Sequence, residues 1–325
     1  MPDLVTIGVP VYRGGAFIAE ALGSIRDQTH RELEVLISVD GGDPNDIAAC
    51  EPFLDDPRFR LIVQPERLGW VGNIGALMDQ AAGTYWCYHQ QDDILKPDYI
   101  QALHATMAKR PRVAVAFSDI QCFGAVDWKI TQAPVTGSDL ARQLTLMTDH
   151  FNGVAFRGLT RVAALRSHGA LYANEADDFA AETVWMSAIA RAGPLVRVPR
   201  LLYAKRYHQD NIHTKWAKWP VEKRLHAWCV HCRDMAGIAL GIDAPAAEKR
   251  LIWAAAILRL MGTRVGKPYV EPAIDGAAAE ERLPMFLRLC EAERDSFTEA
   301  LEMPWQEIGS LARALIGTAS PRLSA

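Results

Sequence analysis

The amino-acid sequence predicts an α/β fold: a Rossmann-like, mainly parallel sheet flanked by helices, followed by a helical C-terminal region. Apolar strand patterns alternate with amphipathic helix patterns through the first half of the chain, which is typical of parallel strands joined by right-handed crossovers. From about residue 216 the chain becomes rich in Ala, Leu, Glu and Arg, and its patterns are helical. Two carboxylates end one buried strand, where such sheets bind ligands.

Each element is assigned from its periodicity and its flanking turn residues. Residues 5–12 are an apolar strand, and residues 16–28 carry apolar side chains at helical spacing. The second strand, 33–39, closes on a turn in which two glycines permit a tight bend. The other expected elements are strand 60–64, helix 69–82, the strand from residue 86, helix 100–109, short strands 195–199 and 201–207, and helices 221–240, 245–261, 280–294 and 305–316.

The strand that begins at Trp86 ends on Asp92 and Asp93. Two adjacent carboxylates repel each other and need a cation. A hard divalent ion together with a phosphate-bearing substrate is the partner that fits best. The alternative is an exposed cluster that caps the following helix, because Asp is common at that position.

Composition narrows the class of protein. The chain has 325 residues, enough for one large domain and a smaller one, and half of them are hydrophobic. Its net charge of −4 gives no sign of a general nucleic-acid binder. The start at Met1 has neither the basic segment nor the apolar core of a signal peptide, and no apolar run approaches the ~18 residues that span a bilayer. With six scattered cysteines and no disulfide framework, we expect a cytoplasmic protein.

Four short segments then resemble, in order and spacing, the signatures of family 2 glycosyltransferases. The resemblance covers roughly the first 215 residues. It implies the A-type glycosyltransferase fold, with residues 1–215 as the nucleotide-sugar-binding domain and residues 216–325 as a helical C-terminal region. The four segments are Val9-Pro10-Val11-Tyr12, Gln28-Thr29, Val39-Asp40-Gly41-Gly42-Asp43 and Gln91-Asp92-Asp93.

The resemblance implies roles on the nucleotide side of the donor. Tyr12, after Pro10, would lie against the base, and Asp40 would accept a hydrogen bond from a pyrimidine ring NH, which favours a uridine donor. Arg67 and Asn73 match the family's nucleotide-side loop and helix start. The alternatives are simple packing for Tyr12, a turn cap for Asp40, and polar helix-end positions for Arg67 and Asn73.

The resemblance also implies a metal site. The family's motif is commonly acid, any residue, acid, and here Gln91 stands at the first acidic place. Asp93 would bind Mn²⁺ or Mg²⁺, and Asp92 would face the sugar and ribose. The ion would bridge the two phosphates and offset charge on the leaving nucleoside diphosphate.

A later segment resembles the one that closes the nucleotide site in the family. His208 would be a further metal ligand, and Arg206 or Lys205 would meet phosphate. A lone histidine is otherwise commonly structural or exposed.

The catalytic base is expected early in a helix that runs to about residue 193. An inverting transfer needs a carboxylate that takes the proton of the acceptor hydroxyl. The family supplies a Glu-Asp pair, and the matching residues here are Glu182 and Thr183, so the second acid is absent. Either Glu182 is the base, or Asp178 serves from one turn earlier, or the enzyme is impaired. We prefer Glu182. Acidic residues here also stabilise the helix dipole.

These features favour an inverting, metal-dependent glycosyltransferase of bacterial type, which moves a sugar from a UDP-sugar to a hydroxyl of a polysaccharide or other glycan. One alternative is a nucleotide-sugar-binding protein without transfer activity, because Gln91 and Thr183 depart from the family pattern. The other is a sugar nucleotidyltransferase. That class generally has a Gly-rich basic loop after the first strand, and here only Arg13 precedes two glycines.

The C-terminal region carries no recognisable chemistry. His226, Cys229, His231 and Cys232 suggest zinc, but they lie in one expected helix without a second paired set, so buried cysteines and solvated histidines are preferred. The region would serve as a lid, an acceptor platform, a homodimer face or a peripheral contact with the inner face of the membrane. Interleaved basic and Trp residues fit the membrane contact weakly.

Overall fold

The computed structural model describes residues 4–149, 153–169, 171, 173–209, 211, 215, 216, 218–262 and 279–319. The chain divides into two compact units. The first comprises residues 1–136, 153–173 and 192–208, and the second residues 137–152, 174–191 and 209–325. Among the described residues, every strand belongs to the first unit. Two segments of the second unit precede residue 216, where the sequence places a domain boundary, and that boundary stays a prediction.

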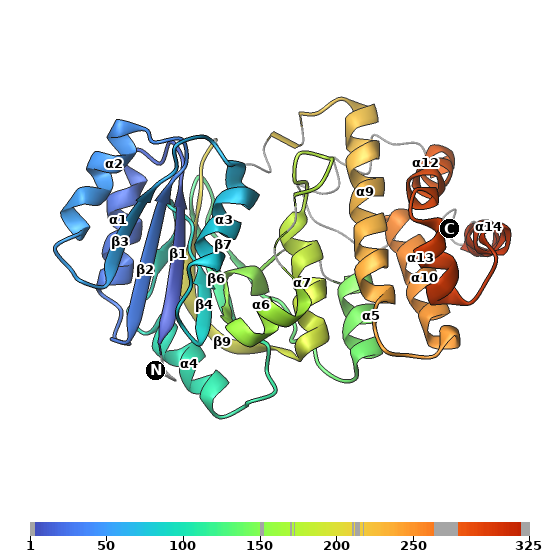
Figure 1. The fold of residues 1–325 in the computed structure, drawn as a ribbon, viewed down its shortest axis with the longest axis horizontal. Helices are drawn as coiled ribbons and strands as arrows, with labels where there is room; N and C mark the ends of the chain where they lie inside the picture. Colours follow the sequence, from blue (N-terminus) through green and yellow to red (C-terminus); the bar gives the residue numbers. More distant parts are fainter. Residues whose placement is uncertain are drawn as a thin grey trace. The chain divides into compact units, whose positions relative to one another are not determined.

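The first unit is built on a mixed sheet (Figure 1). Its nine strands, counted within the described ranges, have the order β3-β2-β1-β4-β8-β6-β9-β5, with β7 paired to β6. The strands are β1 Val5–Val11, β2 Leu33–Val39, β3 Phe59–Val63, β4 Tyr85–Tyr88, β5 Ile94–Leu95, β6 Val115–Gly124, β7 Trp128–Ile130, β8 Leu159–Arg161 and β9 Leu195–Tyr207. Strands β5, β7 and β8 run antiparallel to their neighbours, and the others pair in parallel. This confirms the predicted fold class.

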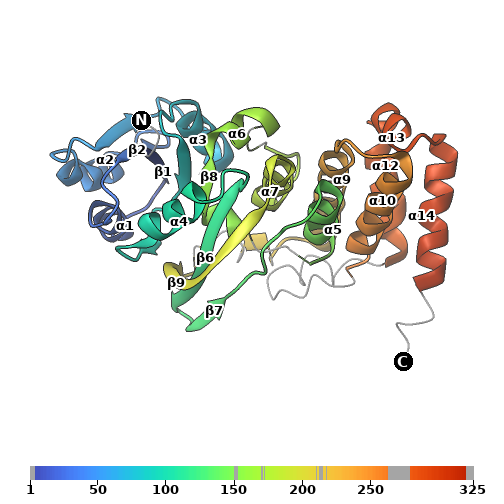
Figure 2. The same ribbon diagram turned by 90° about the horizontal axis from the view of Figure 1, so that it is seen from below.

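The central strands are apolar on both faces because helices cover both faces of the sheet. In β2 the consecutive side chains of Val35, Leu36 and Ile37, which point to alternate faces, are all fully buried. Figure 2 shows α3 and α6 on one side of the strands, with α1 and α4 on the other. The helices of this unit are α1 Phe17–Arg26, α2 Pro44–Cys50, α3 Gly69–Asp79, α4 Tyr99–Ala108 and α6 Val162–His168, with the 3-10 turns η1 Glu51–Phe53 and η2 Ala155–Arg157.

Strand pairing sets the edge on which the site forms. Strands β1 and β2 are parallel and in register from Val5 opposite Leu33 to Val11 opposite Val39. Strand β4 is parallel to β1 on its other side. The loops after β1, β2 and β4 therefore leave from one edge of the sheet, and these loops carry Tyr12, Asp40 and the acidic pair.

One expectation about the late strands is wrong. The two short strands predicted at 195–199 and 201–207 form a single strand, β9. Its pairing with β6 passes from Ser118 opposite Val198 to Asp119 opposite Leu201. The two intervening residues thus form a bulge, which accommodates Pro199 because proline has no N–H to donate to a ladder. Pro199 therefore lies at an irregularity within β9 and does not separate two strands.

The second unit is helical. Two indole rings dominate its interior: Trp253 contacts Phe286 and Phe297, and Trp228 donates its Nε1–H to the carbonyl of Leu260 at 2.9 Å. No helix in the described part of the chain has both the length and the apolar character that crossing a membrane requires. The helices are α5 Asp139–Asp149, α7 Ala181–Ala192, α9 Val221–Leu240, α10 Ala246–Leu260, α12 Ala279–Glu291, α13 Arg294–Leu301 and α14 Trp305–Ala319.

Helix α9 corrects a second expectation. Cys229 and Cys232 are buried as predicted, but His231, predicted to be solvated, is 0% exposed. Its Nε2 accepts hydrogen bonds from Arg259 Nε at 3.2 Å and Nη2 at 2.9 Å. Burial and the adjacent Arg259 guanidinium hold the pKa of His231 well below its usual value, so the ring is neutral. His231 is a core acceptor for a buried arginine.

Candidate active site

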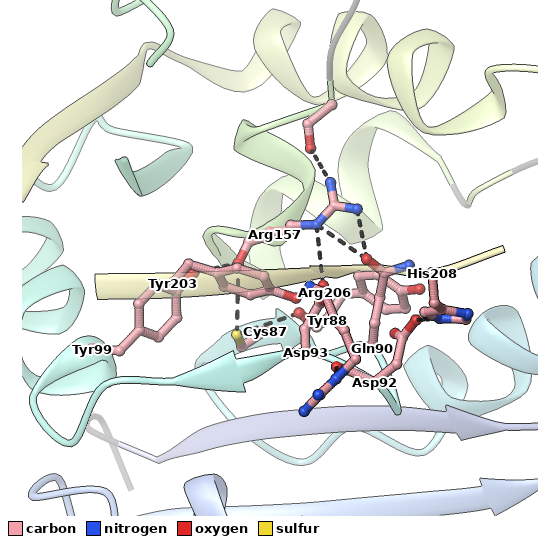
Figure 3. Close-up of polar contacts among 11 residues, drawn as sticks. Cys87, Tyr88, Gln90, Asp92, Asp93, Tyr99, Arg157, Tyr203, Arg206 and His208 are labelled. Carbon is pink, nitrogen blue, oxygen red and sulfur yellow. Dashed lines mark hydrogen bonds and ion pairs between the residues drawn. The ribbon is translucent and has the colours of Figure 1, made fainter. Parts of the chain in front are cut away.

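Asp93 lies at the centre of the strand-edge site and is 1% exposed. The hydroxyl of Tyr203 donates to Oδ2 at 2.7 Å, and the backbone N–H of Arg206 donates to Oδ1 at 2.8 Å. The guanidinium Nε of Arg157 lies 3.7 Å from Oδ2 (Figure 3). Burial, and then the neighbouring Asp92, raise the pKa of Asp93 to about 6, against the opposing charges of Arg157 and Lys205.

Asp92 points away from this buried network and meets His208. Its Oδ2 lies 2.8 Å from the Nε2 of His208, and the two side chains are 14% and 23% exposed, respectively. The histidine ring also packs against Phe17 of α1, with 5.1 Å between ring centroids. The structure thus places His208, a predicted metal ligand, against Asp92, with both side chains partly open to solvent.

Arg206 is committed to contacts within the first unit. Its Nε donates to the carbonyl of Asp92 at 3.0 Å, and its Nη2 donates to Glu20 at 2.6 Å. Its guanidinium lies 4.6 Å from the ring centroid of Phe17 and 4.5 Å from that of Phe123. These contacts join β9 to the acidic turn, to α1 and to β6. In this arrangement the guanidinium of Arg206 has a structural role, because it holds these elements together.

Lys205 is the other basic residue that the sequence associates with phosphate. Its ammonium lies 4.7 Å from the ring centroid of Tyr207. Burial, and then the charge of Arg157, lower the pKa of Lys205 to about 8, while Asp93, Cys122 and Asp92 oppose the shift. A diphosphate placed beside this amine would favour its charged form.

Arg157 is a residue of the site that the sequence analysis missed. It ends η2, and its Nε and Nη2 donate to Oε1 of Gln90 at 3.2 and 2.6 Å. Its Nη1 donates to the carbonyl of Gly153 at 3.1 Å. The side chain is 14% exposed and supplies the positive charge beside Asp93. The available signal was one arginine directly after the apolar run 154–156, which is weak without knowledge of what it meets.

Asp40 holds the loop that leads into α3. Its Oδ1 accepts the backbone N–H of Leu68 at 2.6 Å, and its Oδ2 accepts that of Gly69 at 3.0 Å. Asp40 is 3% exposed, and the two glycines after it have positive φ angles of 78° and 65°. Each carboxylate oxygen has a second lone pair. The reading of a base by Asp40 stays a prediction.

Asn73 and Arg67 occupy different environments. Asn73 is 1% exposed; its amide nitrogen donates to the carbonyl of Ser38 at 3.0 Å, and its Oδ1 accepts from the Ser38 hydroxyl. It fastens α3 to β2. The exposed Arg67 lies with its guanidinium 4.3 Å from the ring centroid of Tyr12. Pro10, opposite Ser38 in the β1–β2 register, precedes this aromatic position by two residues.

The loop after β1 is held from two sides. Gln91 accepts the backbone N–H of Tyr12 at 2.8 Å and donates to the carbonyl of Tyr12 at 3.0 Å. Asp46 of α2 accepts the next two backbone N–H groups, of Arg13 at 2.6 Å and Gly14 at 3.0 Å. The aromatic position predicted to meet a base is therefore fixed through its backbone.

The predicted catalytic carboxylates belong to the second unit. Asp178 lies in a turn before α7 in which Asp177, Asp178 and Ala180 have positive φ angles of 51°, 58° and 52°. Its Oδ1 accepts the backbone N–H of Asn174 at 3.1 Å, and burial, partly offset by this bond, raises its pKa. Glu182 lies in the first turn of α7 and is partly exposed.

The described residues fit a divalent ion only in part. Among them no group of three or more His, Cys, Asp or Glu side chains is arranged to hold a metal. The pair of Asp92 and His208 offers two donor atoms close together and partly exposed. Divalent ions that act on phosphates often take one or two protein ligands and complete their shell with phosphate oxygens and water. Both oxygens of Asp93 already accept hydrogen bonds from the protein.

The mixed sheet and the acidic strand edge define the A-type glycosyltransferase class of fold. The structure is similar to S. aureus TarS residues 1–349 in complex with UDP-GlcNAc, with a TM-score of 0.65, 15% identity, and coverage of 88% of this chain and 81% of that one. It is also similar to the mannosyltransferase PcManGT from Pyrobaculum calidifontis in complex with GDP-Man and Mn²⁺, with a TM-score of 0.52, 16% identity, and coverage of 98% and 87%. At these identities the likeness concerns the fold.

The family follows from the sequence profile. Residues 6–169 match Glycosyl transferase family 2, and the chain belongs to this family. An uncharacterized glycosyltransferase of Haemophilus influenzae is 22% identical over 213 residues, which cover 63% of this chain and 66% of that protein. The putative glycosyltransferase EpsH of Bacillus subtilis is 34% identical over 104 residues, or 31% and 30% of the two chains. The chain spans less than two thirds of these relatives' own lengths.

Proposed function

We propose that this chain transfers a sugar, with inversion, from a UDP-sugar to a hydroxyl group of a polysaccharide or other glycan acceptor. The observation that carries the proposal is the strand edge, where Tyr12, Asp40 and Asp92 follow the neighbouring strands β1, β2 and β4. His208, which follows β9, meets Asp92 there. Family membership and the fold support it, as does the UDP-GlcNAc held by the similar S. aureus protein. We also propose that the protein acts in the cytoplasm, where nucleotide sugars are available.

On the donor side, the uracil would lie against Tyr12, beside the guanidinium of Arg67. Asp40 would accept the pyrimidine NH with a lone pair not used by the loop. Because the guanidinium of Arg206 already contacts Asp92 and Glu20, Lys205 would contact the diphosphate.

For the metal, the proposal places Mn²⁺ or Mg²⁺ at Asp92 and His208. The ion, when bound, would offset the negative charge that develops on the leaving nucleoside diphosphate. Direct ligation by Asp93, as the sequence predicts, would use a second lone pair on an oxygen that already accepts a hydrogen bond from Tyr203 or from the backbone of Arg206.

Glu182 and Asp178 are the two candidates for the base. Transfer with inversion requires a carboxylate that removes the proton of the attacking hydroxyl, and a raised pKa brings a carboxylate nearer to the working pH. Burial raises the pKa of Asp178. Glu182 lies at the family's position in the first turn of its helix.

Calorimetry and product analysis test the proposal. UDP and a panel of UDP-sugars would be titrated into the protein with Mn²⁺ and with a chelator, and slow donor hydrolysis would be followed by UDP release. We expect UDP binding that strengthens with Mn²⁺, and UDP as the nucleotide product. If the protein binds UDP-sugars but releases no UDP with any acceptor tested, it is a binding protein. If it releases pyrophosphate from UTP and a sugar phosphate, it is a nucleotidyltransferase.

A further inference from the structure

Gln91 pairs with Tyr12 as a neighbouring strand would. Its amide oxygen accepts the N–H of Tyr12 at 2.8 Å, and its amide nitrogen donates to the C=O of the same residue at 3.0 Å. This pairing needs a side chain that both donates and accepts. A carboxylate only accepts, so an acid at position 91 would face the carbonyl of Tyr12 with like charge.

The rest of the loop is shaped around this contact. Asp46, 3% exposed, accepts the N–H groups of Arg13 and Gly14. Arg13 has a φ of 51°, a left-handed conformation that costs about 1 kcal/mol or more in a residue with a side chain. A Cβ atom at position 14 would lie 2.7 Å from Oε1 of Gln91. The surroundings thus hold the loop in one strained, closely packed conformation.

The ring of Tyr12 projects from this fixed backbone and is partly exposed. Two guanidinium groups lie near it, that of Arg67 at 4.3 Å and that of Arg13 at 5.2 Å from the ring centroid. Gln91 also directly precedes Asp92, so one short turn contacts both the aromatic loop and His208. The two ends of a nucleoside diphosphate would meet side chains set by this turn.

We propose that Gln91 is a positioning residue for the donor base. It holds the backbone of Tyr12, and through it the aromatic surface on which the base lies. At the place where the family's motif commonly has an acid, this chain then has an amide with a different role. The amide of Gln91 holds the loop that carries Tyr12. This inference rests on the proposed function, because it takes a nucleoside diphosphate as the ligand.

A double-mutant cycle tests it. Gln91→Met keeps the length of the side chain but removes both hydrogen bonds, and Gln91→Glu keeps the acceptor while replacing the donor with a negatively charged oxygen. Each would be made in the parent and in the Tyr12→Ala background, with Gln80→Met as a matched control, because Gln80 is exposed at the end of α3 and its amide donates to the carbonyl of Ala76. We expect the Gln91 variants to bind UDP about 10-fold more weakly than the parent, the scale of a lost buried hydrogen bond, and to add nothing in the Tyr12→Ala background.

Inorganic pyrophosphate, as a competitor for labelled UDP, provides a second readout that a general loss of structure would move. Gln91→Met should keep the parent's affinity for pyrophosphate, because the phosphate end does not depend on Tyr12. Thermal unfolding checks that the variants fold, and Gln91→Asn serves if Gln91→Met does not.

Equal losses in the two backgrounds would overturn the inference, because Gln91 would then act without Tyr12. Unchanged UDP affinity in every Gln91 variant would overturn it too. A parent that binds no nucleoside diphosphate would instead reject the proposed function, and the inference with it.

Discussion

The carboxylate of Asp93 combines two opposing features. Burial favours its neutral form, yet it accepts hydrogen bonds from Tyr203 and from the backbone of Arg206, which suit a charged acceptor. Arg157 resolves the conflict by placing a fixed positive charge 3.7 Å away. Removing that charge would leave Lys205 as the remaining positive charge that acts on Asp93, while its hydrogen-bond donors are neutral, and a buried carboxylate that loses such a partner is destabilising.

We therefore predict that Arg157→Met lowers the free energy of unfolding by about 1–3 kcal/mol, the scale of a buried polar group that loses one of its partners. Arg157→Lys, which keeps the charge but not the fork to Gln90, should lose less. Urea denaturation at neutral pH measures both. Equal midpoints for the parent and Arg157→Met would show that Asp93 does not depend on this guanidinium.

A second prediction separates the two acids of the pair. Asp92→Asn should abolish the Mn²⁺-dependent part of UDP affinity and leave the fold intact, because Asp92 is partly exposed and faces His208. Asp93→Asn should mainly lower stability. Calorimetry of UDP binding with and without Mn²⁺ compares them. Loss of the metal effect only in Asp93→Asn would return the ligand role to Asp93.

The location of a residue was predictable wherever a motif stands at a strand end. Asp92 and Asp93 were assigned from one buried strand, and their location at the sheet edge is confirmed. The contacts of Arg157 and Gln91 were not predictable, because each depends on a backbone or side chain brought close only by the folded sheet. Local pattern identifies what a residue can do, whereas tertiary packing selects its partner.

At the scale of elements, the bounds of helices and strands are predicted best where polar residues do not interrupt the apolar pattern. Strand β2 and helix α9 have the predicted bounds, because their apolar periodicity is uninterrupted. Strand β6, Val115–Gly124, was not predicted as a strand. It carries Ser118 and Asp119 in its middle, and Asp119 is satisfied by two 2.7 Å bonds from Arg197 of the neighbouring strand. Asp119 interrupts the apolar pattern of β6, and its partner lies on another strand, so the sequence of β6 alone does not predict a strand.

The turn before α7 supports a prediction of its own. Three residues with side chains hold positive φ angles there, and such strain is concentrated at functional sites. If Glu182 is the base, Glu182→Gln should keep UDP affinity and reduce sugar transfer by about 10²–10⁴, the usual contribution of a positioned acid or base. Steady-state transfer to a demonstrated acceptor measures it. Loss in Asp178→Asn, with Glu182→Gln near the parent rate, would give the role to Asp178.

At the scale of the whole molecule, buried neutral histidines make stability depend on pH. In the folded chain the pKa of His231 lies well below its usual value, and that of His89 is lowered to about 3, in both cases chiefly by burial. The unfolded chain takes up these protons near pH 6.5 and the folded chain does not. Each histidine therefore costs no stability above that pH and destabilises the fold progressively below it.

We predict that His231→Gln, which keeps an acceptor for Arg259 but does not titrate, flattens the pH dependence of unfolding. Below about pH 5.5 the free energy of unfolding of the parent should fall by about 1.4 kcal/mol per pH unit more than that of the variant, the linkage value for one proton. Urea midpoints across this range measure the difference. Parallel pH profiles would mean that His231 is protonated in the folded chain.

The close approach at Gly14 has an evolutionary consequence. A side chain at this position would lie too close to Ile18 and to the amide oxygen of Gln91, so Gly14 and Gln91 constrain each other although they stand 77 positions apart in the sequence. Substitutions at the two sites are therefore expected to covary. Homologues that carry glutamine at the motif's first acidic place should retain glycine in the first loop, and a larger residue there would require changes at both Ile18 and Gln91.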